Sequence, residues 1–230
     1  MNIAIDITPL QTRHVNRGVG TYTTLLIEAL QKYEKKHSYH FFTRGQNVPE
    51  NVDIVHYPYF DPFFLTLPVL KPHPTVVTVH DLIPLVFPEH FPAGIRGMVK
   101  WQVQRWSLRG VTRVITDSDS SKRDIIMRIA GISSQAIDVV RLAPASVFRP
   151  VTDKTLLRMV ATKYTLPRRF ILYVGDINWN KNIVGLLGAF QNSKQKEGCG
   201  SYLVIGSLEE LEKNRHKKSN QYFILRHAES

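Results

Sequence analysis

The stretch FILYVGDINWNKNIVGLLGAF, residues 170–190, decides the fold. Its first five residues are apolar without a break, β-branched or aromatic, which is typical of a strand buried on both faces of a parallel sheet. Gly175 follows, where the chain must turn tightly, and apolar residues then recur at helical spacing over 183–190. Strand, turn and helix together predict the first half of a βαβ unit.

This turn also indicates anion binding. In a βαβ unit the helix N-terminus lies at the carboxyl edge of the sheet and presents N–H groups to an anion. Lys181 stands at the start of the predicted helix and would add a point charge for a phosphate.

Composition limits the classes of protein to which the chain can belong. The 230 residues are 43% hydrophobic, enough for one large domain or one and a half ordinary ones. Cys199 is the single cysteine, so no intrachain disulfide framework forms and a reducing compartment is expected. Residues 1–10 lack the pattern of a signal peptide, and no run reaches the length of a membrane span. We expect a cytoplasmic protein, with peripheral contact at the inner face of the membrane as the alternative.

The net charge of +11 is spread along the chain, with +5 in residues 1–151 and +6 in residues 152–230. Such a field favours phosphorylated substrates, anionic lipid headgroups or other polyanions, or it serves solubility alone. The sequence has no zinc-ligand pattern and no RNA-binding aromatic motif, so we expect no specific nucleic-acid recognition and no metal site.

Short apolar strands alternate with helices over residues 1–150, which predicts one mostly parallel sheet with helices on both faces. The expected strands are 2–7, 39–43, 53–57, 75–80, 114–116 and 137–141. The Pro- and Phe-rich segment 58–74 is typical of an irregular surface loop. A polar linking helix is expected over 152–166, and the domain boundary within 150–167.

A glycine-containing loop follows the first predicted strand. It ends in Arg17-Gly18-Val19-Gly20, and a helix is expected from near Thr21. Strand, glycine loop and helix form a phosphate-cradling arrangement. Thr23 stands where a dinucleotide fingerprint requires its third glycine, so a flexible loop remains an alternative interpretation.

Two polar residues, His80 and Asp81, end the predicted strand at 75–80. The carboxyl ends of strands are where α/β sheets bind ligands, so this pair is the leading candidate for chemistry. Alternatively, both side chains bond to the backbone and simply end the strand.

An amphipathic helix is predicted over 94–113, with Ile95, Met98, Val99, Val103 and Trp106 on one arc. Its five basic residues have no acidic residue between them. Such a helix either lies against anionic lipid or packs its apolar face on the sheet. The next helix is expected to begin with Ser121 as its N-cap, in the capping box 121–124.

Five segments in this order resemble glycosyltransferase family 4, a retaining, metal-independent group with the GT-B fold. The segments are RGVGTYTTLLIEAL, VVTVHDLIPLVFPEHF, VITDSDSSKRDI, VVRLAPASVFRPV and the opening stretch 170–190. The likeness covers about residues 1–206. It implies an N-terminal, acceptor-side Rossmann-like domain over 1–150, a linker over 151–166, and the start of a donor-side Rossmann-like domain over 167–206. A charged tail would follow over 207–230.

The resemblance implies a hexosyltransferase that moves a mannose- or glucose-type sugar from a nucleotide-sugar to a saccharide or lipid-linked acceptor. No cofactor is implied besides this donor. His80 and Asp81 would be catalytic, and His80 would sit at the reaction centre. The donor phosphates would meet Gly175, Lys181 and Asn182, and the acceptor loop would be Arg17, Gly18 and Gly20.

The sequence also departs from the family. Asn180 stands where many members have an arginine before the lysine, and no counterpart of the family's E-x7-E segment is found. We therefore expect a second domain of two strands, weak donor binding and little turnover. The ending Arg226-His227-Ala228-Glu229 resembles the opening of the histidine phosphatase superfamily, or it is a random exposed terminus.

Two other functions compete with the transferase. One is a non-catalytic fragment that binds an acceptor or a membrane surface. The other is an unrelated nucleotide-binding oxidoreductase, which the missing third glycine and the lack of an acidic ribose partner disfavour.

Overall fold

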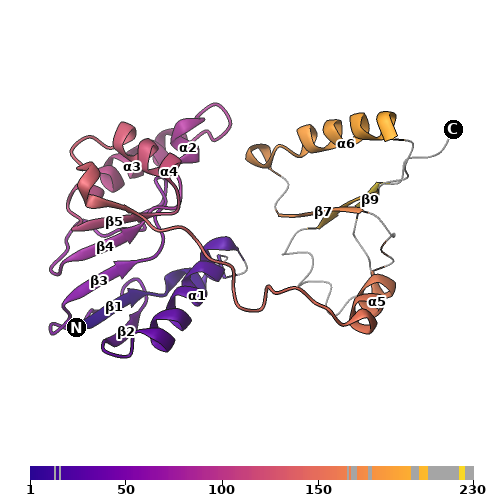
Figure 1. Ribbon diagram of the computed structural model, residues 1–230. Helices are drawn as coiled ribbons and strands as arrows, with labels where there is room; N and C mark the ends of the chain where they lie inside the picture. The colour runs from indigo at the N-terminus through magenta and orange to yellow at the C-terminus, as the bar shows by residue number, and fades with distance from the viewer. Residues whose placement is uncertain are drawn as a thin grey trace. The chain divides into compact units, whose positions relative to one another are not determined.

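The computed structural model describes residues 1–230 except 13, 16, 165, 167–169, 176–177, 198–201, 207–222 and 226–230. The chain forms two compact units, Met1–Ala145 and Ser146–Ser230 (Figure 1).

The first unit is built on a six-stranded sheet in the order β2-β1-β3-β4-β5-β6, in which every neighbouring pair is parallel. Its strands are β1 (Asn2–Asp6), β2 (Ser38–Phe42), β3 (Ile54–Tyr57), β4 (Thr75–Thr78), β5 (Arg113–Thr116) and β6 (Ile137–Val139). Helices flank the sheet, so the predicted α/β, Rossmann-like class is confirmed.

Four α-helices connect these strands: α1 (Gly18–Tyr33), α2 (Ile83–Val86), α3 (Gly94–Arg109) and α4 (Asp119–Arg128). Two short 3-10 helices, η1 (Thr8–Gln11) and η2 (Ser134–Ala136), precede α1 and β6. The helix predicted over 94–113 therefore ends four residues earlier, because Arg113 already belongs to β5.

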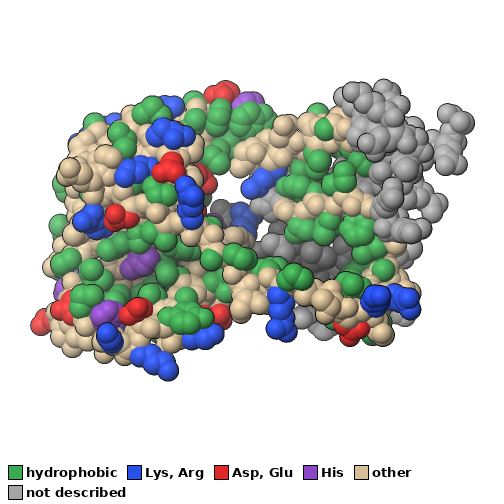
Figure 2. Space-filling view, viewed as in Figure 1, with side chains coloured by type: hydrophobic (Ala, Val, Ile, Leu, Met, Phe, Trp, Pro, Cys, Tyr) green, Lys and Arg blue, Asp and Glu red, His purple; other side chains and the backbone are tan. Residues whose placement is uncertain are grey.

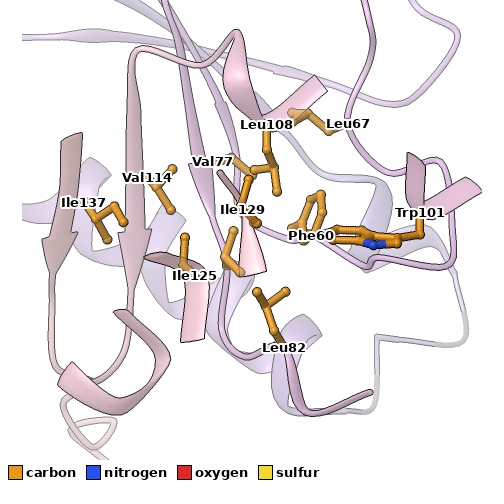
Figure 3. Close-up of a cluster of buried hydrophobic side chains, with 11 residues drawn as sticks. Phe60, Leu67, Val77, Leu82, Trp101, Leu108, Val114, Ile125, Ile129 and Ile137 are labelled. Atoms are coloured by element: carbon orange, nitrogen blue, oxygen red, sulfur yellow. The ribbon is translucent and has the colours of Figure 1, made fainter. Parts of the chain in front are cut away.

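The main core lies between α3, α4 and the β4–β6 half of the sheet. Figure 3 shows Trp101 and Leu108 of α3 with Ile125 of α4, packed against side chains of the strands. Phe60 and Leu67 also lie in this core, although their segment was predicted to be a surface loop. The segment 58–74 is irregular as expected, but part of it is buried.

Two helix starts differ from the sequence predictions. α1 begins at Gly18, so both glycines lie in the first helical turn and not in a loop before Thr21. The N-cap of α4 is Ser118, whose Oγ accepts a hydrogen bond from the Ser121 N–H at 3.1 Å. Ser121 was predicted to be the cap, but it is the third residue of the helix and has a buried side chain.

The second unit contains α5 (Lys154–Lys163), β7 (Phe170–Val174), η3 (Trp179–Lys181), α6 (Ile183–Glu197), β8 (Tyr202–Gly206) and β9 (Phe223–Leu225). The side chain of Asp153 caps α5 by accepting from the N–H groups of Thr155 and Leu156. Helix α6 packs on the β7 side chain of Tyr173 through Ile183 and Phe190, so the predicted strand–turn–helix unit forms.

Two predictions for this unit were wrong. β7 was expected to be buried on both faces, yet Ile171, Leu172 and Val174 are exposed. β7 is the edge strand in the order β7-β8-β9, and helix α6 packs on its Tyr173. The sheet was expected to have two strands, but β9 adds a third that runs antiparallel to β8.

Candidate active site

His80 follows the end of β4 and is held by two acceptors. Its Nδ1 lies 2.7 Å from Asp117 Oδ2, and its Nε2 lies 3.2 Å from the Pro58 carbonyl oxygen. Asp117 follows β5, which pairs in parallel with β4, so the two strand ends lie side by side. The side chains of His80 and Asp117 are 17% and 22% exposed, so the pair is partly buried but open to solvent.

Both partners of the His80 ring offer oxygen atoms that accept hydrogen bonds, a carboxylate at Nδ1 and a carbonyl at Nε2. The second carboxylate oxygen, Asp117 Oδ1, is buried without a hydrogen-bond partner among the described residues.

A set of neutral polar groups surrounds the pair. Thr78 Oγ1 lies 2.9 Å from His56 Nε2 and 3.3 Å from the Tyr22 hydroxyl. Burial lowers the pKa of His56 to about 4, with a smaller contribution from the charge of His80. Burial also raises the pKa of Tyr22, so both groups are uncharged at neutral pH.

Tyr22 connects α1 to His80. Its ring packs edge-on against the imidazole, with the ring centroids 4.6 Å apart. Tyr22 directly follows the first turn of α1, so Gly18 and Gly20 belong to the helix end that lies near His80. Arg17 is the N-cap residue of α1, and its side chain is exposed.

Asp81, the other residue of the predicted catalytic pair, bonds to the backbone. Its Oδ1 accepts from the Ile83 N–H at 3.0 Å, at the start of α2, and the side chain is exposed. This local turn is the alternative that the sequence left open for Asp81. Of the two acids, the one that contacts His80 is Asp117.

A cavity of about 520 Å³ opens at the carboxyl edge near β1 and β3. The chain passes from β1 to β2 on one side and then to β3 on the other, and such a switch point is where α/β sheets bind ligands. The lining residues include Asp6, Thr8, Thr12, His14, Arg44, Tyr59 and Phe64.

Asp6 is the buried acid of this cavity. Burial raises the pKa of its carboxyl, although hydrogen bonds from Thr8 act in the opposite direction. Oδ1 accepts both the Thr8 N–H, at 2.9 Å, and the Thr8 hydroxyl. The Thr8 hydroxyl oxygen in turn accepts from the Arg44 N–H at 2.9 Å, so the loops after β1 and β2 are joined.

Gln104 of α3, which sequence reasoning missed, fixes the loop on the other side of the cavity. Its Oε1 accepts from the N–H groups of Thr66 and Leu67 and from the Thr66 hydroxyl, at 2.9–3.0 Å. Its Nε2 donates to the Leu67 carbonyl at 2.8 Å, and the side chain is fully buried. An isolated glutamine on a helix gives no sequence signal for this role.

The residues predicted to bind donor phosphate lie in the second unit. Gly175 has φ +155° at the end of β7, which suits the tight turn. Lys181 is exposed at the end of η3. Asn182 adopts a left-handed conformation, and its Oδ1 accepts from the Gly185 N–H at 3.2 Å, so it caps α6. Their contact with a phosphate stays a prediction.

Metal and membrane features were searched within the described ranges. No three His, Cys, Asp or Glu side chains gather there in a way that could hold a metal ion. In the same ranges, no helix combines the length and apolar character needed to cross a membrane. His227 and the rest of the phosphatase-like ending lie outside the described residues.

The parallel sheet, with polar groups at its carboxyl edge and helices around it, defines a Rossmann-like domain. Residues 46–142, from the loop after β2 to just beyond β6, match the family model of Glycosyltransferase Family 4. The matched segment includes His80, Asp117 and Gln104. The predicted resemblance to the N-terminal domain of this family is therefore confirmed over these residues. No curated protein matches the chain.

Proposed function

We propose that the chain transfers a mannose- or glucose-type sugar from a nucleotide-sugar to a saccharide or lipid-linked acceptor. The family match supports a glycosyltransferase in general. The observation that supports this site is His80, held through Nδ1 by Asp117 at the carboxyl edge of the matched domain.

In this reaction the bond from the sugar C1 to the diphosphate oxygen breaks, and a bond from C1 to the acceptor oxygen forms. The acceptor hydroxyl gives up its proton to the departing diphosphate. The largest change in charge is the negative charge that develops on the departing diphosphate. Lys181 and the N–H groups at the start of α6 would stabilise this charge.

His80 would orient the sugar. Because Nδ1 is bound to a carboxylate at 2.7 Å, the longer 3.2 Å contact of Nε2 with Pro58 is the easier one to exchange. A sugar hydroxyl that replaces the Pro58 carbonyl would receive the Nε2–H hydrogen bond.

The cavity near β1 and β3 would take the saccharide acceptor. Its volume of about 520 Å³ suits a small ligand. Tyr59 and Phe64 offer apolar ring faces, while Asp6 and Thr12 offer oxygen atoms for sugar hydroxyls.

The test is calorimetric titration with uridine- and guanosine-diphosphate sugars, followed by mass spectrometry of transfer to saccharide acceptors. Because donor binding is expected to be weak and turnover low, transfer is measured at high donor concentration over long incubation. We expect low transfer that His80→Gln abolishes and that His40→Gln, at an exposed position, leaves unchanged. Full transfer by the His80→Gln protein would contradict the assigned role.

A second candidate function is acceptor binding without transfer. It is favoured by the cavity near β1 and β3, because all of the residues that line it belong to the first unit. Saccharide binding that Tyr59→Leu weakens, with no transfer from any donor, would select this function over the first.

A further inference from the structure

The apolar arc of helix α3 points away from the core of the first unit and is exposed. Its buried side is made by Gly97, Trp101, Gln104, Ser107 and Leu108. On the other side, Ile95, Met98, Val99 and Trp106 are 87%, 48%, 61% and 58% exposed. Four of the five residues that the sequence placed on one apolar arc are therefore exposed. We call these four residues the α3 surface.

Basic residues flank the centre line of this surface. At about 100° per residue, Ile95, Val99 and Trp106 fall within an arc of about 40°. Arg96 lies on one side of this line, and Arg105 and Arg109 lie on the other. Figure 2 shows hydrophobic and basic side chains intermixed over the part of the first unit where Figure 1 places α2 and α3.

The α3 surface continues into an apolar hollow at the start of the helix. A cavity of about 830 Å³ is lined by Pro84, Pro88, Phe91, Ile95 and Met98, with the basic side chain of Arg128 at its border. A Cβ at Gly97 would lie 2.9 Å from the Cβ of Ala93, the N-cap residue of α3, and 3.7 Å from the Phe63 ring. Aliphatic groups can therefore enter a surface depression at this end of the helix.

The charged residues of the segment that contains α3, residues 90–116, are all basic. Residues 90–116 contain five Lys or Arg residues and no Asp or Glu. The Lys100 ammonium lies 5.1 Å from the centre of the Phe64 ring, and Arg109 Nε donates to the Ala130 carbonyl at 2.8 Å. The nearest acids along the chain, Glu89 and Asp117, lie outside this run, and Asp117 is engaged by His80.

We propose that the α3 surface docks on an anionic lipid bilayer, with Ile95, Val99 and Trp106 entering the boundary between headgroups and acyl chains. An apolar line flanked by cations is the pattern of helices that lie in a membrane interface, where Trp is also enriched. Each Lys or Arg near an anionic surface adds about 1 kcal/mol of attraction. This inference does not depend on the transferase function, because it concerns a different face of the first unit.

The experiment is co-sedimentation of the full chain with vesicles of phosphatidylglycerol and phosphatidylcholine, compared with phosphatidylcholine alone. We expect binding to the anionic vesicles only. The double variant Ile95→Ser/Val99→Ser should weaken this binding by at least about tenfold, because the inserted apolar side chains are lost. Both positions are well exposed, so the fold should be retained.

A charge variant tests the second half of the proposal. Arg96→Gln/Arg105→Gln keeps the apolar line, and the loss of two cations should weaken binding by about ten- to thirtyfold. The matched controls are Met127→Ser, at an exposed apolar position on α4, and Lys35→Gln/Lys36→Gln, at exposed basic positions just after α1. Both controls should bind like the unchanged chain.

Several results would overturn the proposal. They are no binding to anionic vesicles, equal binding by the Ile95→Ser/Val99→Ser variant, and losses of the same size in the controls. Self-association of the chain that the same double variant abolishes, without vesicle binding, would assign this face to a second copy instead.

Discussion

Asp117 Oδ2 lies 2.7 Å from His80 Nδ1, although 37 residues separate the two along the chain. The contact arises because β4 and β5 are parallel neighbours and each residue follows the end of its strand. The ends of adjacent parallel strands meet at one edge, so polar residues placed there come together without any sequence motif that spans both.

The first prediction concerns this pair. Asp117→Asn keeps the shape of the side chain but removes its charge and places an amide group where Oδ1 is buried without a partner among the described residues. We expect a loss of about 1.5–3 kcal/mol in the free energy of unfolding, the usual range for a hydrogen bond to a charged group. Denaturant unfolding at pH 7 measures it.

Asp119→Asn is the control for this variant. Asp119 is exposed and pairs with Arg141 at 3.3 Å, so its loss should cost less than about 1 kcal/mol. Equal losses in the two variants would mean that the His80–Asp117 contact adds nothing beyond an ordinary surface ion pair.

The second prediction is a pH dependence caused by His56. Its pKa falls from 6.5 in the unfolded chain to about 4 in the folded one. Above pH 6.5 neither state binds the proton, so the contribution to stability is fully present. Between pH 6.5 and about 4 only the unfolded state binds it, and stability falls as pH falls, by up to about 1.4 kcal/mol per pH unit.

The measurement is the free energy of unfolding across this pH range for the unchanged chain, for His56→Gln and for the exposed control His40→Gln. The slope should become shallower in His56→Gln and stay the same in His40→Gln. Because the slope is the readout, a general loss of stability in His56→Gln does not obscure the result. An unchanged slope would show that His56 titrates alike in both states.

The parallel sheet and the position of His80 could be predicted from the sequence, because both follow from local patterns. Short apolar strands specify the sheet, and the first polar residue after β4 marks its carboxyl edge. The partner of His80 could not be predicted in the same way. Asp81 is adjacent in sequence, but only the strand register brings Asp117 to the ring.

The orientation of α3 was not predictable either. Helical periodicity identifies an apolar arc, but not which arc faces the sheet. The core around Trp101 and Leu108, together with the hydrogen bonds of Gln104, fixes the helix with Ile95 and Val99 outward. For β7, the apolar run predicted the strand correctly, whereas the burial of its side chains depends on the elements that cover the two faces of the sheet, which the run does not specify.

The third prediction concerns Gln104. Gln104→Met keeps the size of the side chain but leaves the N–H groups of Thr66 and Leu67 and the Leu67 carbonyl without this partner. Buried groups left unpaired are costly, so we expect a loss on the order of 2–4 kcal/mol. Denaturant unfolding measures it, and Gln102→Met, at an exposed position two residues earlier, should change stability by less than about 0.5 kcal/mol. A stable Gln104→Met protein would show that the loop is held by its apolar side chains alone.

The last prediction separates the two glycines at the start of α1. A Cβ at Gly20 would overlap the carbonyl oxygens of His14 and Val15 and come within 2.7 Å of the Val15 carbonyl carbon. These are backbone atoms, so the loop itself would have to move. A Cβ at Gly18 would meet nothing within 4 Å.

We therefore expect Gly20→Ala to destabilise the chain by about 1–3 kcal/mol, as overpacking does. Gly18→Ala should leave stability unchanged or raise it by up to about 1 kcal/mol, because alanine favours helix. Thermal unfolding of both variants without any ligand is the measurement. If Gly20→Ala is as stable as Gly18→Ala, the close approach of residues 14–15 to α1 does not require glycine, and a contact with ligand becomes the better reason for its presence.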